Sequence, residues 1–197
     1  MRLIGLCGRS GSGKSLLCQI CSEHGIKIID CDAVYRKLVS YKSDCLVEIA
    51  ENFGDAVIKD SALDRRYLAP IVFSDPQKLQ LLNKITHKHI TAEIYKILDT
   101  YSDSDIVILD APTLFESGLN SSCDIVVAVV ADDAVCLSRI IKRDNLSEQE
   151  ALARLSNQKP LSFYDENCDY VIHNNTSLDE YEQQILKFIK MLKEGNI

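Results

Sequence analysis

The sequence lacks the features that mark membrane, secreted and nucleic-acid-binding proteins. No apolar run reaches the roughly 20 residues needed to cross a bilayer, and no signal-type apolar region precedes the first expected strand. Positive charge is scarce, because 22 Lys and Arg face 29 Asp and Glu, a formal net charge of −7, which argues against general nucleic-acid binding. We therefore expect a soluble, cytoplasmic monomer or small homo-oligomer that binds neither membranes nor nucleic acid.

The eight cysteines do not form a recognisable metal or disulfide framework. Cys18 and Cys21 have C-x-x-C spacing, but no second C-x-x-C or C-x-x-H pair completes a zinc site. Most of the cysteines lie in apolar segments, where cysteine behaves as a small buried hydrophobe. We expect reduced thiols that pack in the core.

Short apolar runs rich in Ile, Val and Leu alternate with helical patterns, which predicts an α/β fold. Nearly continuous apolar runs are typical of parallel strands buried on both faces. The expected fold is a three-layer, doubly wound, parallel five-stranded sheet. The five predicted strands are Leu3–Cys7, Ile26–Ile29, Ile106–Leu109, Ile125–Val130 and Tyr170–Ile172.

About 75 residues separate the second strand from the third, far more than one crossover helix needs. Helical patterns fill this interval. We predict one domain over residues 1–197, with a core of about 1–32, 104–131 and 168–197. An inserted helical lobe for a phosphate acceptor covers about 33–103, and a helical lid covers about 132–167. The predicted helices are Leu16–His24, Ala33–Val39, Ser43–Phe53, Asp64–Phe73, Asp75 to about Tyr101, Asp132–Arg143, Ser147–Gln158 and Leu178–Lys193.

The segment Gly8–Ser15 matches the phosphate-loop pattern G-x-x-x-x-G-K-[ST] and follows an apolar strand. Its glycines let backbone N–H groups face one anion, and the next helix adds the positive end of its dipole. Lys14 is expected to reach the β and γ phosphates of ATP, and the Ser15 hydroxyl to bind Mg²⁺. The alternative is a simple turn between a strand and a helix. The predicted nucleotide-binding residues here are Gly8, Gly11, Ser12, Gly13, Lys14, Ser15 and Leu16.

Acidic residues follow two further predicted strands. Asp32, after the second strand, is the candidate base for an acceptor hydroxyl, although Asp30 and Asp32 are also suited to capping the next helix. Asp110 ends an apolar strand in the manner of a Walker-B acid that supports Mg²⁺. Pro112 and Glu116 extend that strand into a loop near the acceptor, or form an ordinary turn.

Basic residues outside the loop are candidates for contacts with anionic ligands. Arg139 and Arg143 lie four apart on one helix face, where a closing lid would bring them to the transferred phosphoryl group, unless they form a solvated basic face. Arg65 and His87 in the inserted lobe supply positive charge for an anionic acceptor. Tandem basic residues commonly lie on the surface without contacting a ligand, and His87 is equally suited to a structural role.

Taken together, these motifs resemble those of the dephospho-CoA kinase family, a nucleoside-monophosphate-kinase-like branch of P-loop proteins. The likeness runs from Met1 to about Asn175. The order and spacing of the motifs carry it. They are Leu6-x-Gly8, Gly11-Ser12-Gly13-Lys14-Ser15, Ile29-Asp30-x-Asp32, Leu63-Asp64-Arg65-Arg66, Val72-Phe73-Ser74-Asp75-Pro76, Asp110-x-Pro112-x-Leu114-Phe115-Glu116-Ser117-Gly118, Arg139-x-x-x-Arg143-Asp144, Gln158, and Asp169-Tyr170-Val171-Ile172-x-Asn174-Asn175.

The resemblance implies transfer of the ATP γ-phosphate to the ribose 3′-hydroxyl of dephospho-CoA, the last step of CoA biosynthesis. It implies that Asp32 is the base, that Arg139 and Arg143 are lid arginines, and that the loop containing Asn175 holds the adenine. The lobe with Arg65 and His87 resembles the family's CoA-binding lobe. Arg9-Ser10 departs from the common Gly-Ile of the family's phosphate loop.

Three other functions share the phosphate loop. Nucleotide, shikimate and gluconate kinases lack the later series of motifs. A GTP-dependent switch usually carries an Asn/Thr-Lys-x-Asp tetrad, which this sequence lacks. A P-loop ATPase or chaperone would use water as the acceptor, and Asp32 would then orient that water.

Overall fold

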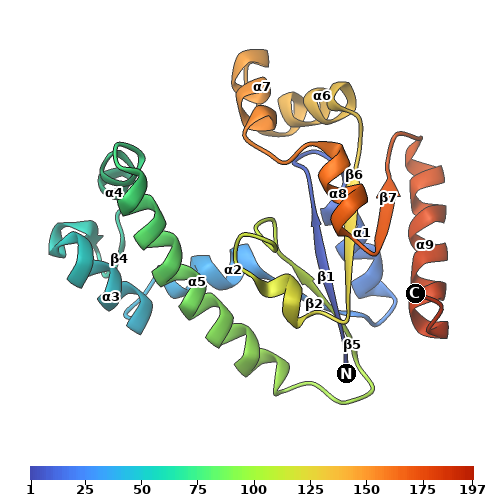
Figure 1. Cartoon of the computed structure of the whole chain (residues 1–197), viewed down its shortest axis with the longest axis horizontal. Coiled ribbons are helices and arrows are strands. Elements are labelled where there is room, and N and C mark those ends of the chain that lie inside the picture. Colours follow the sequence, from blue (N-terminus) through green and yellow to red (C-terminus); the bar gives the residue numbers. More distant parts are fainter. The chain divides into compact units, whose positions relative to one another are not determined.

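Five strands form the central sheet, in the order β2-β5-β1-β6-β7 (Figure 1). The computed structural model describes all 197 residues. Strand β1 pairs in parallel with β5 on one side and with β6 on the other, and β6 pairs in parallel with β7. The predicted five-stranded parallel sheet is confirmed. The strands are β1 (Arg2–Gly8), β2 (Lys27–Asp30), β5 (Ile106–Asp110), β6 (Ile125–Val130) and β7 (Tyr170–His173).

Helices cover both faces of this sheet. Helices α1 (Lys14–Glu23) and α9 (Leu178–Glu194) pack on the face formed by alternate strand residues such as Ile4, Val127 and Ile172. On the other face lie α8 (Leu161–Asn167), which contacts β6 and β7, and the short helix η2 (Leu119–Ser122), which contacts β1. Because both faces are covered, the central residues of the strands are apolar. The predicted three layers are therefore present.

Helices α6 (Asp133–Asp144) and α7 (Glu148–Ser156) lie beyond the carboxyl ends of β1 and β6 (Figure 1). Their facing sides bury a small core that includes Cys136, Ile140 and Ala151. Helix α7 begins with a capping box, in which Ser147 and Glu150 satisfy each other's backbone N–H groups, as the sequence predicts. The pair is thus a small helical layer with its own apolar contacts.

The chain divides into two compact units, residues 1–29 with 102–197 and residues 30–101. The second unit is mainly helical, and α5 contacts each of the other three α-helices in it. Buried Leu46, Ile49, Leu68, Ile85 and Ile94 supply its core. Its elements are α2 (Cys31–Leu38), α3 (Asp44–Phe53), η1 (Asp55–Val57), β3 (Ile58–Lys59), β4 (Ala62–Leu63), α4 (Arg65–Phe73) and α5 (Pro76–Leu98).

Short elements account for most differences from the predicted secondary structure. The antiparallel β3–β4 hairpin was not predicted, because each strand has two residues and its turn places the non-glycine residues Asp60 and Ser61 at positive φ. Helix α8 was not predicted either, because it has seven residues and follows Pro160 without a side-chain cap. The longest helix, α5, ends at Leu98 rather than near Tyr101. No helix in the chain is long and apolar enough to span a membrane.

The cysteines are reduced and most of them pack in the core, as expected from the sequence. All eight cysteines are free thiols, and five of them are buried. Cys21 is fully buried in the core between α1, α9 and the sheet, and Cys18 packs against that core. The C-x-x-C spacing in α1 therefore serves packing.

Candidate active site

The phosphate loop connects β1 to α1 through backbone conformations that favour glycine. Gly8 has φ +135°, and a Cβ atom there would lie 2.0 Å from the carbonyl oxygen of Val129. Gly13, the N-cap of α1, has φ +108°, and a Cβ atom there would lie 2.4 Å from the side-chain nitrogen of Asn174. Both positions combine a left-handed backbone with a close neighbour, so any larger residue would deform the loop.

Side chains from α9 and from the residue that follows β7 hold the carbonyl groups of the loop. Asn174 Nδ2 donates to the Ser12 carbonyl at 2.7 Å, and the Tyr181 hydroxyl donates to the Gly13 carbonyl at 3.1 Å. In a trans peptide the C=O and the following N–H point in opposite directions. The N–H groups of Gly13 and Lys14 therefore face away from these side chains, as an anion-binding loop requires.

The Lys14 ammonium is held inside the phosphate loop. Its Nζ donates to the carbonyl oxygens of Gly8 at 2.8 Å and of Arg9 at 3.3 Å. Burial lowers the pKa of Lys14 from its ordinary 10.5, and the nearby Asp110 carboxylate opposes that shift. A desolvated cation at this position is suited to a polyphosphate, which would replace the two carbonyl groups as its partner.

Oxygen donors for a magnesium ion lie on adjoining elements. Asp110 ends β5, and the exposed Ser15 lies in the first turn of α1, a helix that contacts β5. No group of three or more His, Cys, Asp or Glu side chains gathers anywhere in the chain to hold a metal alone. Magnesium typically takes only one or two protein oxygens and completes its shell with phosphate and water, so this donor set fits Mg²⁺ bound together with a nucleotide.

Helix α6 contributes two arginines that differ in their partners. Arg139 is half-buried and donates to the carbonyls of Gly11 and Asn174 at 3.4 and 3.3 Å, respectively. Arg143 is exposed and forms a two-pronged pair with Asp144, at 2.8 and 2.9 Å. Arg143 also donates to the Ser10 hydroxyl at 3.5 Å. Both arginines therefore contact the loop, and Arg143 in addition has the acidic partner expected of a solvated face.

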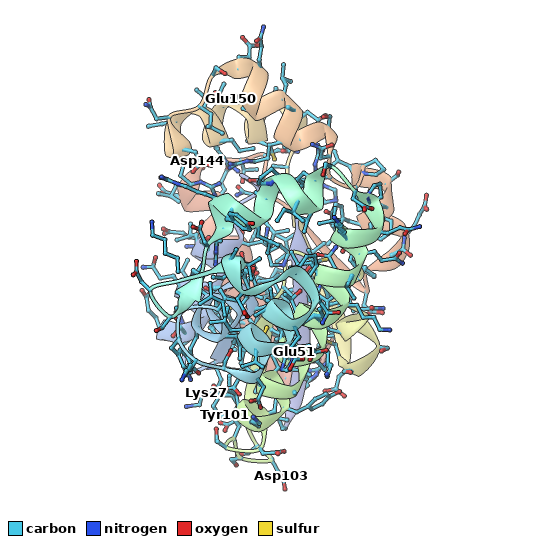
Figure 2. The ribbon with its side chains drawn as sticks, turned by 90° about the vertical axis from the view of Figure 1, so that its left-hand side faces the viewer. Lys27, Glu51, Tyr101, Asp103, Asp144 and Glu150 are labelled. Atoms are coloured by element: carbon cyan, nitrogen blue, oxygen red, sulfur yellow. The ribbon has the colours of Figure 1, made fainter.

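Asp144 links the two helices α6 and α7. It accepts hydrogen bonds from Arg143 on α6 and from Arg154 on α7. The Arg143 guanidinium, followed by Arg154, lowers the pKa of Asp144 from 3.8 to about 2. Figure 2 shows Asp144 and Glu150 on this helix pair, Glu150 being the capping residue of α7.

A second arginine contact joins the loop to the start of α6. Arg9, whose side chain is only 6% exposed, forms an ion pair with Asp133. The neighbouring residue, Ser10, donates its backbone N–H to Gln158 Oε1 at 2.9 Å. The two residues that depart from the family's usual loop sequence therefore contact the segment from α6 to α8.

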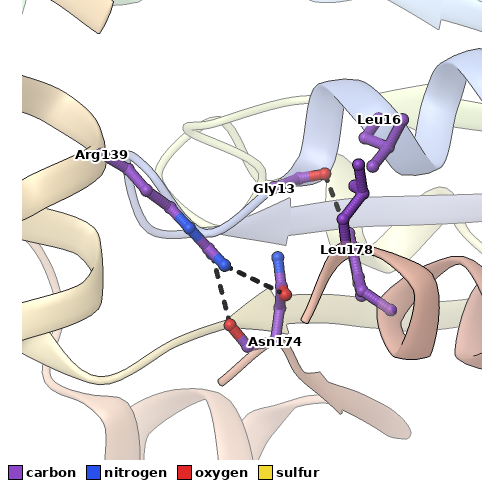
Figure 3. A pocket seen from close by; sticks show the side chains of 6 residues that line it. Gly13, Leu16, Arg139, Asn174 and Leu178 are labelled. Atoms are coloured by element: carbon purple, nitrogen blue, oxygen red, sulfur yellow. Dashed lines mark hydrogen bonds between the residues drawn. The ribbon is translucent and has the colours of Figure 1, made fainter. Parts of the chain in front are cut away.

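A cavity of about 290 Å³ opens beside the loop (Figure 3). The cavity is lined by Gly13, Leu16 and Leu178, and also by Arg139 and Asn174. The Arg139 guanidinium donates to the Asn174 side-chain oxygen at 3.3 Å. Apolar side chains beside a guanidinium plane suit a flat heteroaromatic ring. The adjacent Asn175 does not line the cavity and instead pairs with Asp132 through two hydrogen bonds, at 2.8 and 2.9 Å.

Three of the predicted site residues belong to the second unit. Asp30, at the end of β2, caps α2 by accepting the N–H of Ala33 at 2.8 Å, whereas Asp32 is exposed in the first turn and takes no part in that cap. Arg65 is exposed and stacks on Tyr35 with 5.1 Å between the guanidinium carbon and the ring centroid. His87 is half-buried within α5.

Pro112 and Glu116 lie in the exposed loop after β5. Glu116 is 3.9 Å from Lys159 in the segment between α7 and α8, and Phe115 packs edge-on against Phe163 of α8 with ring centroids 5.0 Å apart. This loop is therefore packed against the α8 region.

The sequence alone did not identify two residues that hold the loop. Tyr181 lies within the predicted helix Leu178–Lys193, and its hydroxyl contact with Gly13 has no local sequence signal. In the sequence, Arg9 is notable only because it departs from the common Gly-Ile of the family's phosphate loop.

Comparison with known proteins identifies a consistent set of relatives. Residues 2–180 match the model of the dephospho-CoA kinase family. The dephospho-CoA kinase of Listeria innocua is 35% identical over 192 residues, which cover 96% of each chain. Among solved structures, a Thermus thermophilus protein is 29% identical with a TM-score of 0.82 over 97% of both chains. The dephospho-CoA kinase of Campylobacter jejuni is 27% identical with a TM-score of 0.74 over 100% of both chains.

Proposed function

Since the chain belongs to the dephospho-CoA kinase family, we propose that it transfers the γ-phosphate of ATP to the ribose 3′-hydroxyl of dephospho-CoA, giving CoA and ADP. The observation that carries this proposal is the family match over residues 2–180, which includes the intact phosphate loop with Lys14. Kinases of the P-loop class use such a loop to hold the phosphates of the donor. Other small-molecule kinases and P-loop switches are not favoured by these relatives.

On the donor side, the loop is proposed to bind the ATP phosphates. The N–H groups that follow Ser12 and Gly13 would donate to phosphate oxygens, and Lys14 would exchange its two carbonyl partners for the β and γ phosphates. Arg139 is proposed to stabilise charge on the transferred group, with Arg143 binding the nucleotide. The cavity beside Gly13 and Leu16 is the proposed position of the adenine, next to Asn175.

Magnesium is proposed as the metal of this reaction. Ser15 and Asp110 would hold it, Ser15 through its hydroxyl and Asp110 through its carboxylate. When bound, the ion neutralises charge that develops on the phosphate oxygens. The rest of its shell would come from the nucleotide and water.

On the acceptor side, Asp32 is proposed to accept the proton of the 3′-hydroxyl as that oxygen attacks phosphorus. Its exposed carboxylate and the assignment of the α2 cap to Asp30 support this role. The unit of residues 30–101 is proposed to bind dephospho-CoA, with Arg65 and His87 as contacts. Pro112 and Glu116 are further proposed contacts with the acceptor, and the segment 132–167 is the proposed lid.

The cellular setting is proposed as the cytoplasm, with a small molecule as the only substrate partner and no nucleic acid. Eight free thiols and a formal net charge of −7 support this assignment. We propose that the protein acts as a monomer or small homo-oligomer.

Release of ADP measured with and without added dephospho-CoA tests the function. We expect turnover that depends on dephospho-CoA, with a phosphorylated product detected by mass. Parallel reactions with gluconate, shikimate and nucleoside monophosphates should give no product. Release of ADP at the same rate without any acceptor would overturn the kinase assignment and favour an ATPase.

A further inference from the structure

Two cysteines that are 161 residues apart in the sequence meet beside the phosphate loop. Cys7 Sγ and Cys168 Sγ are 3.7 Å apart. Cys7 precedes the first loop residue, Gly8, and Cys168 lies between α8 and β7. In the sheet register Cys7 is opposite Ala128 of the intervening strand β6, a residue with a small side chain.

The two thiols differ in exposure and in acidity. Cys7 is 1% exposed, whereas Cys168 is partly exposed. A hydrogen bond from the Cys7 thiol lowers the pKa of Cys168, while the interaction with Cys168 and burial raise the pKa of Cys7. The thiolate is the reactive form of cysteine. Cys168 thus has the properties of an attacking thiol, and Cys7 those of a resolving thiol.

Five other cysteines have a raised pKa, namely Cys18, Cys21, Cys45, Cys123 and Cys136. Burial raises the pKa of Cys45 and of Cys123 to about 11, and that of Cys21 to about 12. Thiols with raised pKa values react slowly with oxidants. The contact between Cys7 and Cys168 therefore stands apart from ordinary cysteine packing.

We propose that Cys7 and Cys168 form a peroxide-sensitive dithiol that closes to a disulfide and thereby weakens nucleotide binding at the adjacent loop. In the first step, the Cys168 thiolate attacks one oxygen of hydrogen peroxide, the O–O bond breaks, and sulfenic acid and hydroxide form. In the second step, the Cys7 thiol loses its proton as its sulfur attacks Cys168 Sγ, the S–O bond breaks, and the hydroxyl group takes up that proton and leaves as water. Two thiols lose two electrons and two protons, and one peroxide becomes two water molecules.

Closing this bond requires movement, because a disulfide joins its sulfur atoms at about 2.05 Å and the thiols are 3.7 Å apart. The β1 side is constrained, since β1 is paired on both edges and Gly8 lies against the Val129 carbonyl. The adjustment therefore falls mainly on Cys168 and α8. Gln158, just before α8, accepts the N–H of Ser10 at 2.9 Å. A shift of α8 would thus be transmitted to the phosphate loop.

Peptide mapping of the whole chain tests bond formation. Reduced protein is treated with hydrogen peroxide, blocked with N-ethylmaleimide and digested with trypsin, with and without a reductant. Cleavage after Arg2 and Arg9, and after Arg154 and Lys187, leaves each of the two thiols in a peptide without a second cysteine. We expect peptide 3–9 joined to peptide 155–187, and its loss on reduction. Irreversible oxidation of Cys168 without the joined peptide would overturn the proposal.

Nucleotide affinity, measured by titration calorimetry, tests the consequence. Oxidation should weaken ATP binding by about fivefold or more, a typical coupling between two sites, and reduction should restore it. The variant Cys168→Ser should bind ATP equally well before and after peroxide. The matched control Cys123→Ser, which removes another partly exposed thiol, should respond as the unmodified chain does. A joined peptide with unchanged ATP affinity would overturn the regulatory role.

Discussion

The side-chain amide of Asn174 donates a hydrogen bond to the carbonyl oxygen of Ser12 across 162 positions of sequence, at a distance of 2.7 Å. Asn174 is 3% exposed, and its side-chain oxygen accepts from Arg139 at 3.3 Å. One amide thus fixes both a loop peptide and an arginine of α6. The conformation of the phosphate loop depends on residues near the other end of the chain.

Replacing Asn174 with Ala should therefore destabilise the protein and weaken ATP binding together. The loss of a buried hydrogen bond that leaves the Ser12 carbonyl unsatisfied costs about 1–3 kcal/mol. Urea unfolding and calorimetric titration with ATP measure the two effects. Asn196→Ala is the control, because Asn196 is exposed and its side chain bonds to Glu194, away from the loop. Equal losses in both variants would contradict a special role for Asn174.

Replacing Asp32 with Asn should lower turnover by about a hundredfold or more, the usual contribution of a general base, while ATP affinity stays nearly unchanged. Steady-state assays with dephospho-CoA and binding titrations separate these quantities. The matched control is Asp30→Asn, which keeps a good capping residue for α2. An equal loss of turnover in the control would show that the effect comes from the helix start rather than from a base.

Replacing Asp133 with Ala should destabilise the folded state more than Arg9→Met does. Without Asp133 the guanidinium of Arg9, only 6% exposed, keeps its charge and loses its partner, at a cost of about 1–3 kcal/mol. Without Arg9 no buried charge remains. Urea unfolding of both variants gives the comparison, and Glu148→Gln, a loss of charge in the first turn of α7, controls for the helix dipole. The reverse order would refute the argument.

Asp144 should stabilise the folded state at neutral pH and lose that effect as the pH falls. Its pKa is about 2 in the folded state and 3.8 ordinarily, because Arg143 and Arg154 favour the charged form. A carboxyl group whose pKa is lowered on folding stabilises the folded state at pH values above its ordinary pKa. That stabilisation is lost as the pH falls through the pKa of the folded state. Thermal midpoints of the unmodified chain and of Asp144→Asn should therefore differ above pH 3.8 and converge near pH 2. A difference that persists at the lowest pH would contradict the assignment.

The sequence predicted the sheet well because its signals are local. Each strand is a continuous apolar run that ends at a polar or small residue, and Ile125–Val130 matches its predicted bounds. Helix starts marked by caps, such as Ser147 and Asp75, also agree. Elements without such signals were missed, as in α8, which has seven residues and no side-chain cap.

The candidate site was predictable only in part, for a related reason. The phosphate loop is a contiguous pattern, so its residues could be named from sequence. The contacts that shape it come from Arg139, Asn174 and Tyr181, which lie on α6, β7–α9 and α9. Contacts between residues so far apart in sequence follow from the three-dimensional arrangement and have no local signature. The same is true of the two thiols, Cys7 and Cys168.

The bond from Tyr181 to Gly13 has a consequence for the order of events during synthesis. The ribosome makes Tyr181 168 positions after Gly13. Because strand β7 and helix α9 are translated well after the phosphate loop, a nascent chain that ends before them has the phosphate-binding pattern without its support. We expect the growing polypeptide to acquire high-affinity nucleotide binding only after α9 leaves the ribosome, as contacts of long sequence separation form late.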